Sequence, residues 1–322
     1  MSVQTLLKNP LWILICGRIR NPLEFNSIIY LSTSLREKGI IEGIVLSTWN
    51  DEIDKYPNLR KRIVEQGIII CETQPLSNDQ VSLFRSTYVP QAIQVQVGLN
   101  SIPNDVFVLK CRTDRSCGDV VRILNRLNYQ NLEICSQNVI NEDQQYKVGV
   151  LGPSMPCPFG MRDFAFIGWK KDIQKMILTE TKYYLGHNIT PEISFFTGWY
   201  FHRFDIMIDC FSMIDNGYIW SIMEEYGVWI NKIKKIPQLI LKLYAFYFAS
   251  LKSCFYIIDG DNKDIISLDL LLKSTTCEKP HFINGSLNQS IVDSLCQGKY
   301  HDDDLFAKGI ASLLSKFLKN GN

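Results

Sequence analysis

Three polar clusters in the N-terminal half of the chain carry side chains suited to bind an anionic ligand. They occupy residues 17–21, 47–51 and 110–116, and each follows an apolar run. Arginine guanidinium groups offer forked donors that match phosphate oxygens. A carboxylate close to phosphates is a typical ligand of a magnesium-type cation. These residue types therefore predict a site for a phosphorylated ligand.

The first two clusters predict separate contacts with a nucleotide. Gly17 would let the backbone approach the ligand closely, and Arg18 and Arg20 would meet phosphate groups. In the second cluster, Trp49 would stack on a base and Asp51 would bind a ribose.

The third cluster, Lys110-Cys111-Arg112-Thr113-Asp114, closes an apolar run and has two interpretations. In the functional one, Asp114 holds a divalent cation that neutralises a departing diphosphate. In the structural one, Arg112 and Asp114 form an ion pair that ends a strand. Residue types alone leave both interpretations open.

The first third of the chain alternates between predicted strands and helices. Apolar runs followed by polar or glycine residues indicate buried strands, and longer periodic segments indicate helices. The predicted strands are 12–16, 43–48, 68–71 and 106–111, and the predicted helices are 23–38, 58–66 and a segment within 78–99. This order predicts a mainly parallel α/β sheet flanked by helices, with right-handed crossovers. Ligands of such sheets bind at the carboxyl ends of the strands, where the three clusters lie.

The pattern is looser after residue 115. We expect a helix at 120–127, short strands within 131–150, a strand at 163–168 and a helix from Asp172. An aromatic-rich and mostly helical region follows from Pro191 and ends in an amphipathic helix at 304–319. We therefore expect a catalytic domain at 1–205 and a mostly helical C-terminal extension at 206–322.

Composition excludes several classes of protein. The chain has 322 residues, of which 46% are hydrophobic, and a net charge of +1. These values do not fit a dedicated nucleic-acid binder or a disordered chain. The ten cysteines include no CxxC pair, which indicates buried thiols in a reducing compartment. Because we find neither a secretory leader nor a clean transmembrane run, we expect a cytoplasmic protein.

The order of several short motifs resembles that of the WavE family of lipopolysaccharide-synthesis proteins. The matching segments span roughly residues 11–205. They are Ile15-Cys-Gly-Arg-Ile-Arg-Asn21, Leu46-Ser-Thr-Trp49, Arg85-Ser-Thr87, Gln94, Gly98-Leu99, Val108-Leu-Lys-Cys-Arg-Thr-Asp114, Asp163-Phe-Ala-Phe-Ile-Gly168 and Pro191-Glu192.

The resemblance implies a glycosyltransferase with a GT-A-like, Rossmann-type sheet. Such an enzyme would move a sugar from a nucleotide-sugar donor to a glycan acceptor in surface polysaccharide or lipopolysaccharide biosynthesis. The acceptor would be an oligosaccharide or a lipid-linked glycan. The predicted donor-binding residues are Gly17, Arg18, Arg20, Thr48, Asp51, Arg85, Lys110, Arg112 and Asp114.

GT-A enzymes generally carry an Asp-x-Asp motif that binds a metal ion and the diphosphate. Here the corresponding segment is Arg112-Thr113-Asp114, so only the second carboxylate is present. We therefore expect Asp114 to be the ligand of a manganese or magnesium ion, and Arg112 to take over part of the charge neutralisation.

An inverting transfer needs a general base for the acceptor hydroxyl. Glu192, after Pro191 at the start of a predicted helix, is the first candidate because the family has a Pro-Glu there. Its alternative role is a carboxylate that interacts with the helix dipole. Asp163 is the second candidate, and its alternative role is an ion pair with Arg162.

The segment 232–252 mixes lysines with an apolar face. One interpretation is peripheral contact with anionic lipid on the inner face of the membrane, which would suit a lipid-linked acceptor. The other is a buried amphipathic helix whose lysines are solvated.

Two other functions remain open. One is a nucleotide-dependent transferase of another kind, although neither a GxxxxGK[ST] loop nor a GxGxxG fingerprint is present. The other is a non-catalytic subunit that binds a glycan or a nucleotide within an assembly complex.

Overall fold

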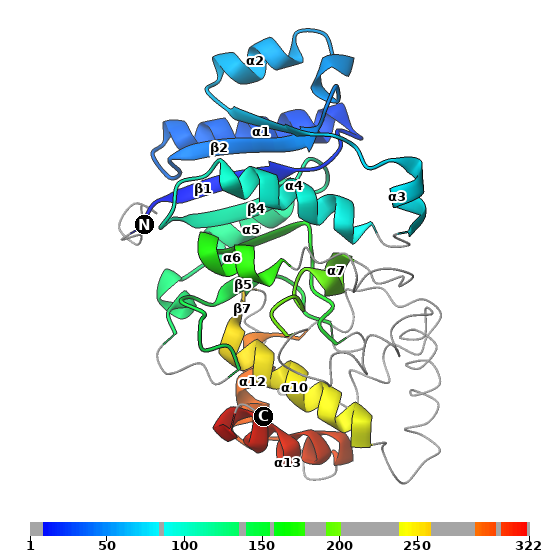
Figure 1. Ribbon diagram of the computed structural model, residues 1–322. Helices are drawn as coiled ribbons and strands as arrows, with labels where there is room; N and C mark the ends of the chain where they lie inside the picture. The colour runs from blue at the N-terminus through cyan, green and yellow to red at the C-terminus, as the bar shows by residue number, and fades with distance from the viewer. Residues whose placement is uncertain are drawn as a thin grey trace.

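A computed structural model describes residues 9–83, 87–134, 140–154, 158–177, 191–200, 238–258, 287–300 and 304–320. Seven strands of these residues form one sheet in the order β3-β2-β1-β4-β6-β5-β7 (Figure 1). The strands are β1 (Leu11–Cys16), β2 (Gly43–Trp49), β3 (Ile69–Thr73), β4 (Phe107–Arg112), β5 (Val148–Val150), β6 (Ala165–Trp169) and β7 (Phe255–Ile257).

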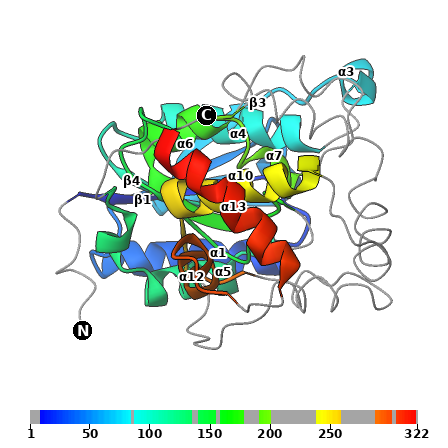
Figure 2. The same ribbon diagram turned by 90° about the horizontal axis from the view of Figure 1, so that it is seen from below.

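Helices cover both faces of the sheet. Viewed from below, α4, α6 and α7 lie on one side of it, and α1 and α5 lie on the other (Figure 2). Helices α10, α12 and α13 gather beyond the β5–β7 edge (Figure 1). The helices are α1 (Pro22–Glu37), α2 (Leu59–Glu65), α3 (Asn78–Leu83), α4 (Tyr88–Asn100), α5 (Cys117–Arg126), α6 (Lys170–Met176), α7 (Pro191–Ser194), α10 (Gln238–Cys254), α12 (Gln289–Cys296) and α13 (Leu305–Asn320), with short 3₁₀ turns η2 (Ile53–Lys55) and η3 (Tyr129–Leu132).

Strands β3, β2, β1 and β4 are mutually parallel, which confirms the expected α/β class and the four predicted N-terminal strands. The chain passes from β1 to β2 on one side, and β4 lies on the other side of β1. This reversal is the topological switch point, where open α/β sheets bind their ligands.

The second half of the sheet is mixed. β6 runs antiparallel to β4 and to β5. β7, from the C-terminal region, pairs parallel with β5. The residues expected to form a helical extension after position 205 therefore also contribute a strand to the main sheet. The domain boundary at that position stays a prediction.

Helix α4 lies unusually close to the sheet at Gly98. A Cβ atom at this position would come within 2.4 Å of Leu14 Cδ1 and 3.0 Å of Ser47 Cβ. Only glycine permits this approach without displacing a neighbour. The close packing fixes the preceding turn of α4, which includes Gln94, over the carboxyl ends of β1 and β2.

The aromatic-rich C-terminal region is core in its described part. Tyr244, Phe246 and Tyr247 of α10 are at most 1% exposed. Their rings contact Phe306 of α13 and Phe159. The apolar face of α10 is therefore packed inside the protein rather than presented to a bilayer, which corrects the lipid-contact interpretation for this helix. Lys232, Lys234 and Lys235 lie outside the described residues.

Among the described residues, no helix has both the length and the apolar character needed to cross a membrane.

Asp172 of helix α6 forms hydrogen bonds with the backbone of residues 145–146, which precede β5. Its side chain is 1% exposed. Its oxygens accept backbone N–H groups from Gln145 at 3.1 and 3.2 Å and from Tyr146 at 2.8 Å. Burial raises the pKa of this carboxyl to about 6, although the two backbone donors act in the opposite direction. Burial thus outweighs the hydrogen bonds.

The raised pKa predicts how Asp172 contributes to stability at different pH values. Because the folded-state pKa exceeds the unfolded value of about 4, the folded protein binds the proton more tightly. The contribution of Asp172 to the free energy of unfolding therefore decreases as pH rises from about 4 to about 6. Asn does not titrate, so Asp172→Asn serves as the reference. We expect the free energy of unfolding of wild type, relative to that of Asp172→Asn, to decrease as pH rises over this range, as measured by urea unfolding. A difference that stays constant, or that grows in favour of the wild type, would contradict this assignment.

Candidate functional site

A pocket of about 310 Å³ opens at the carboxyl ends of β1, β2 and β4, on the face covered by α4. This is the topological switch point of the sheet. One part of its wall is cationic, and another part is apolar. The cationic side chains are Arg18, Arg20, Lys110 and Arg112, and the apolar ones are Trp49, Pro75, Leu76, Pro90 and Val95. The pocket therefore combines a cationic surface with an apolar one.

Gly17 makes the turn that leads from β1 into the pocket. Its φ angle of +128° is one that residues with a side chain rarely adopt, and a Cβ here would lie 3.0 Å from Thr113 Oγ1. Its N–H donates to Ser47 O at 3.1 Å. From the sequence, we expected Gly17 to allow close approach of a ligand. The structure shows that the turn itself requires glycine at this position.

Three hydroxyl groups hold the backbone after β1. Thr48 Oγ1 donates to Gly17 O at 2.9 Å, and Thr113 Oγ1 donates to Arg18 O at 2.7 Å. Tyr56 Oη donates to Ile19 O at 2.8 Å. Three successive carbonyl oxygens are thus bound by protein donors. Residues 17–19 therefore keep the negative ends of these peptide groups turned toward protein donors.

Thr48 and Asp51 do not contact the pocket, contrary to the prediction from the sequence. Thr48 is fully buried, and its hydroxyl binds Gly17 O. Asp51 is exposed and has a φ of +62°, as expected of a residue in a tight turn. Thr48 instead supports the backbone that carries Arg18, and Asp51 is not among the residues that line the pocket.

Glu52 is a residue of this site that the sequence analysis missed. Its carboxylate is 3% exposed and accepts Ile19 N–H at 3.0 Å and Lys55 Nζ at 2.6 Å. Arg18 Nε lies 3.9 Å from the same group. Glu52 thus holds the backbone at Ile19 and lies within ion-pair distance of the Arg18 side chain. The spacing of Glu52 and Lys55, three residues apart, was the available signal for a helical turn at this point.

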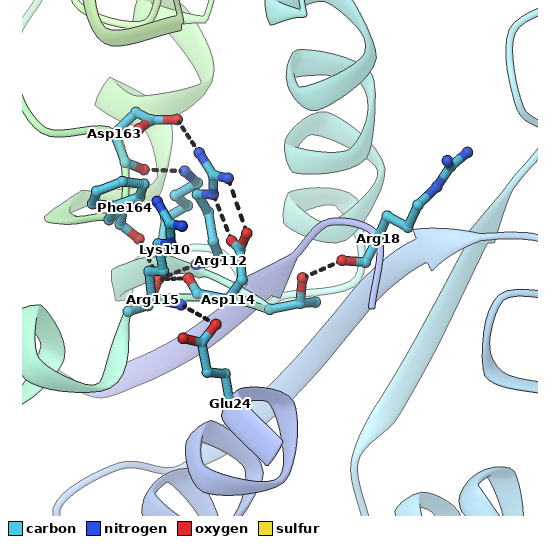
Figure 3. Close-up of polar contacts among 10 residues, drawn as sticks. Arg18, Glu24, Lys110, Arg112, Asp114, Arg115, Asp163 and Phe164 are labelled. Carbon is cyan, nitrogen blue, oxygen red and sulfur yellow. Dashed lines mark hydrogen bonds and ion pairs between the residues drawn. The ribbon is translucent and has the colours of Figure 1, made fainter. Parts of the chain in front are cut away.

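Arg112 is the centre of the charged network (Figure 3). Its guanidinium holds Asp114 with two hydrogen bonds, at 2.9 and 3.2 Å, and reaches Asp163 Oδ2 at 3.2 Å. It also lies 4.9 Å from the centre of the Phe164 ring. Burial acts to lower the pKa of Arg112, but the two carboxylates outweigh it and the pKa is raised. Arg112 is therefore a fixed cation at the pocket wall.

Lys110 is a second cation of the wall and is fully buried. Within the described residues, its ammonium group donates to the backbone oxygen of Asp163 at 2.5 Å. It also lies 4.8 Å from the Phe195 ring centre and 5.2 Å from that of Phe166. Burial lowers the pKa of this amine. An anion bound in the pocket would stabilise its charged form.

Cys16 also lines the pocket, as a buried thiol. Burial raises the pKa of its thiol to about 12, so the reactive thiolate is scarce at neutral pH.

The geometry around Asp114 does not fit the manganese or magnesium ion that the resemblance implies. Both oxygens of this carboxylate accept hydrogen bonds from Arg112. The same guanidinium also binds Asp163. Over the described part of the chain, no three His, Cys, Asp or Glu side chains gather closely enough to hold a metal ion. The guanidinium thus occupies the place beside the carboxylates that a cation would take.

The two predicted catalytic bases are not part of the pocket wall. Asp163 is 1% exposed and its side chain binds Arg112, so it positions that guanidinium. The predicted pairing of Asp163 with Arg162 is replaced by this contact, and Arg162 lies 3.3 Å from Asp119 instead. Glu192 is half-buried in α7, and its backbone oxygen accepts Met161 N–H at 3.0 Å. Arg85 lies outside the described residues.

The structure therefore brings six of the predicted site residues together. These are Gly17, Arg18, Arg20, Lys110, Arg112 and Asp114. By fold and site, the protein is an α/β protein with a cationic pocket at the switch point of its sheet. Comparisons with protein-family models, with curated proteins and with solved structures found no match.

Proposed function

We propose that this protein is a glycosyltransferase that uses a nucleotide-sugar donor. The observation that carries this proposal is the pocket at the switch point, where four cationic side chains stand beside an apolar wall. Arg18, Arg20, Lys110 and Arg112 would bind the diphosphate, and Trp49 would contact the base. The GT-A-like form of the sheet belongs to the same proposal, supported by the 3-2-1-4 order of its parallel half.

In the proposed reaction, a hydroxyl oxygen of the glycan acceptor forms a bond to the anomeric carbon of the donor sugar. The bond from that carbon to the diphosphate breaks, and the nucleoside diphosphate leaves with the electron pair. The cationic wall would stabilise the charge that develops on the diphosphate. Glu192 stays the predicted acceptor of the hydroxyl proton. We place the reaction in surface polysaccharide or lipopolysaccharide biosynthesis, in the cytoplasm or at the inner face of the membrane.

One observation favours a second candidate function. The guanidinium of Arg112 already pairs with the carboxylates of Asp114 and Asp163. A pocket built in this way would also suit a subunit that binds a nucleotide or a glycan without transferring a sugar.

Turnover of nucleotide sugars separates the two functions. UDP-, GDP-, dTDP- and CMP-linked sugars would be incubated with the protein, and release of nucleotide would be measured with manganese and with excess EDTA. Because Arg112 takes the place of a metal ion, we expect one donor class to be hydrolysed at a rate that EDTA changes less than twofold. Binding without turnover would favour the second candidate, and turnover that EDTA abolishes would contradict the role given to Arg112.

A further inference from the structure

The side chain of Gln94 carries a buried donor group that no described residue accepts. Gln94 lies on α4, lines the pocket and is 1% exposed. Its backbone oxygen accepts Ser47 Oγ at 2.6 Å. Its side-chain nitrogen Nε2, however, has no hydrogen-bond partner among the described residues. Buried polar groups are normally paired, and an unpaired one costs free energy.

Helix α4 also carries a glutamine whose side-chain nitrogen is paired within the protein. Gln96 lies two residues further along α4, and its Nε2 donates to Gln174 O at 3.2 Å and to Ile177 O at 3.4 Å. Gln96 is not part of the pocket wall. The unpaired amide thus belongs to the glutamine that faces the pocket, and its partner would come from a ligand.

The surroundings of Gln94 define the part of the ligand that would meet it. Pro90 and Val95 of α4, together with Trp49 at the end of β2, are apolar residues of the same pocket wall as Gln94. The cationic side chains come from the ends of β1 and β4. Flat heterocyclic bases suit an apolar wall with one directed polar group. Phosphates would take the cationic wall.

We propose that Gln94 is a base-specificity residue whose Nε2 donates to a ring carbonyl oxygen of the donor nucleotide. This inference rests on the proposed function and names the class of base, one with a ring carbonyl such as uracil or guanine. Adenine has no carbonyl oxygen, so an adenine nucleotide would leave the buried donor unpaired.

The experiment compares Gln94→Met with the matched control Gln96→Met. Binding of UDP, GDP, IDP and ADP would be measured by calorimetry, and thermal unfolding would be measured without ligand. The base of IDP has a ring carbonyl at the position where the base of ADP has an amino group. Comparing the two nucleotides therefore tests the carbonyl directly.

For wild type, we expect IDP to bind about tenfold more tightly than ADP. For Gln94→Met, we expect this preference to fall to less than twofold, while the unfolding temperature stays the same or rises because an unpaired buried donor is gone. For Gln96→Met, we expect a lower unfolding temperature and an unchanged preference.

Three results would overturn the proposal. In the first, Gln94→Met keeps the wild-type preference and unfolds at a lower temperature, as a structural glutamine would. In the second, wild type binds IDP and ADP equally, which rejects the base assignment while leaving the proposed function intact. In the third, none of the nucleotides binds, which rejects the proposed function together with this inference.

Discussion

Arg112→Met is expected to weaken nucleoside diphosphate binding by about 100-fold, because a cation of the pocket wall is lost. The substitution also removes three hydrogen bonds to Asp114 and Asp163. Asp163 is 1% exposed, so its charge would be left buried without its partner. Removing one member of a buried ion pair costs about 3–5 kcal/mol. We therefore expect a large loss of stability alongside the loss of binding, measured by urea unfolding and calorimetry.

Two further variants separate the binding effect from the stability effect. In Arg112→Met with Asp163→Asn, the stranded carboxylate is neutral, so we expect stability to recover in part while binding stays weak. Arg112→Lys keeps the charge but loses the two-point contact with Asp114, and we expect an intermediate affinity. Recovery of binding in the double variant would show that Arg112 acts only through stability.

Gly17→Ala is expected to disrupt the loop that carries Arg18 and Arg20. The backbone conformation at φ +128° is strained for alanine, and its Cβ would lie 3.0 Å from Thr113 Oγ1. That hydroxyl also donates to Arg18 O. The loop must therefore shift, which moves both arginines relative to the pocket. We expect a stability loss of about 1–3 kcal/mol and a diphosphate affinity at least tenfold lower.

Gly118→Ala is the matched control for this substitution. Gly118 lies in the first turn of α5, and a Cβ there would meet nothing within 4 Å. Alanine has a higher helix propensity than glycine, so we expect unchanged binding and a stability gain of up to about 1 kcal/mol. If Gly17→Ala behaved like this control, the loop would not depend on the glycine conformation.

The parallel half of the sheet was predictable because β1, β2 and β4 are almost wholly buried and therefore contain long apolar runs, and the edge strand β3 still carries a short one. The four predicted strands match β1 to β4 within two residues at each end. The direction of β6 was not predictable, because an apolar run does not show which way the chain passes through a sheet. β7 was missed because Phe255–Ile257 directly follows α10, and three apolar residues after an apolar helix give no separate signal.

The candidate site was predictable where it depends on strand ends and unpredictable where it depends on the face of the sheet. Residues after β1 and β4 meet because parallel neighbours share a carboxyl edge. Successive side chains of a strand point to opposite faces. Trp49 therefore lines the pocket and Thr48 does not, and the sequence does not show which face carries the ligand. Glu52 was missed because its role depends on the turn that brings it to Ile19.

The most direct test of the account compares a nucleoside diphosphate with its nucleoside, titrated into wild type and Arg112→Met in the presence of EDTA. The diphosphate that binds best would be used. We predict that wild type binds it at least 100-fold more tightly than the nucleoside, and that Arg112→Met removes most of this difference while its affinity for the nucleoside changes little. Equal affinities of wild type for the two ligands, or a phosphate preference that survives in Arg112→Met, would contradict the cationic site assigned to this pocket.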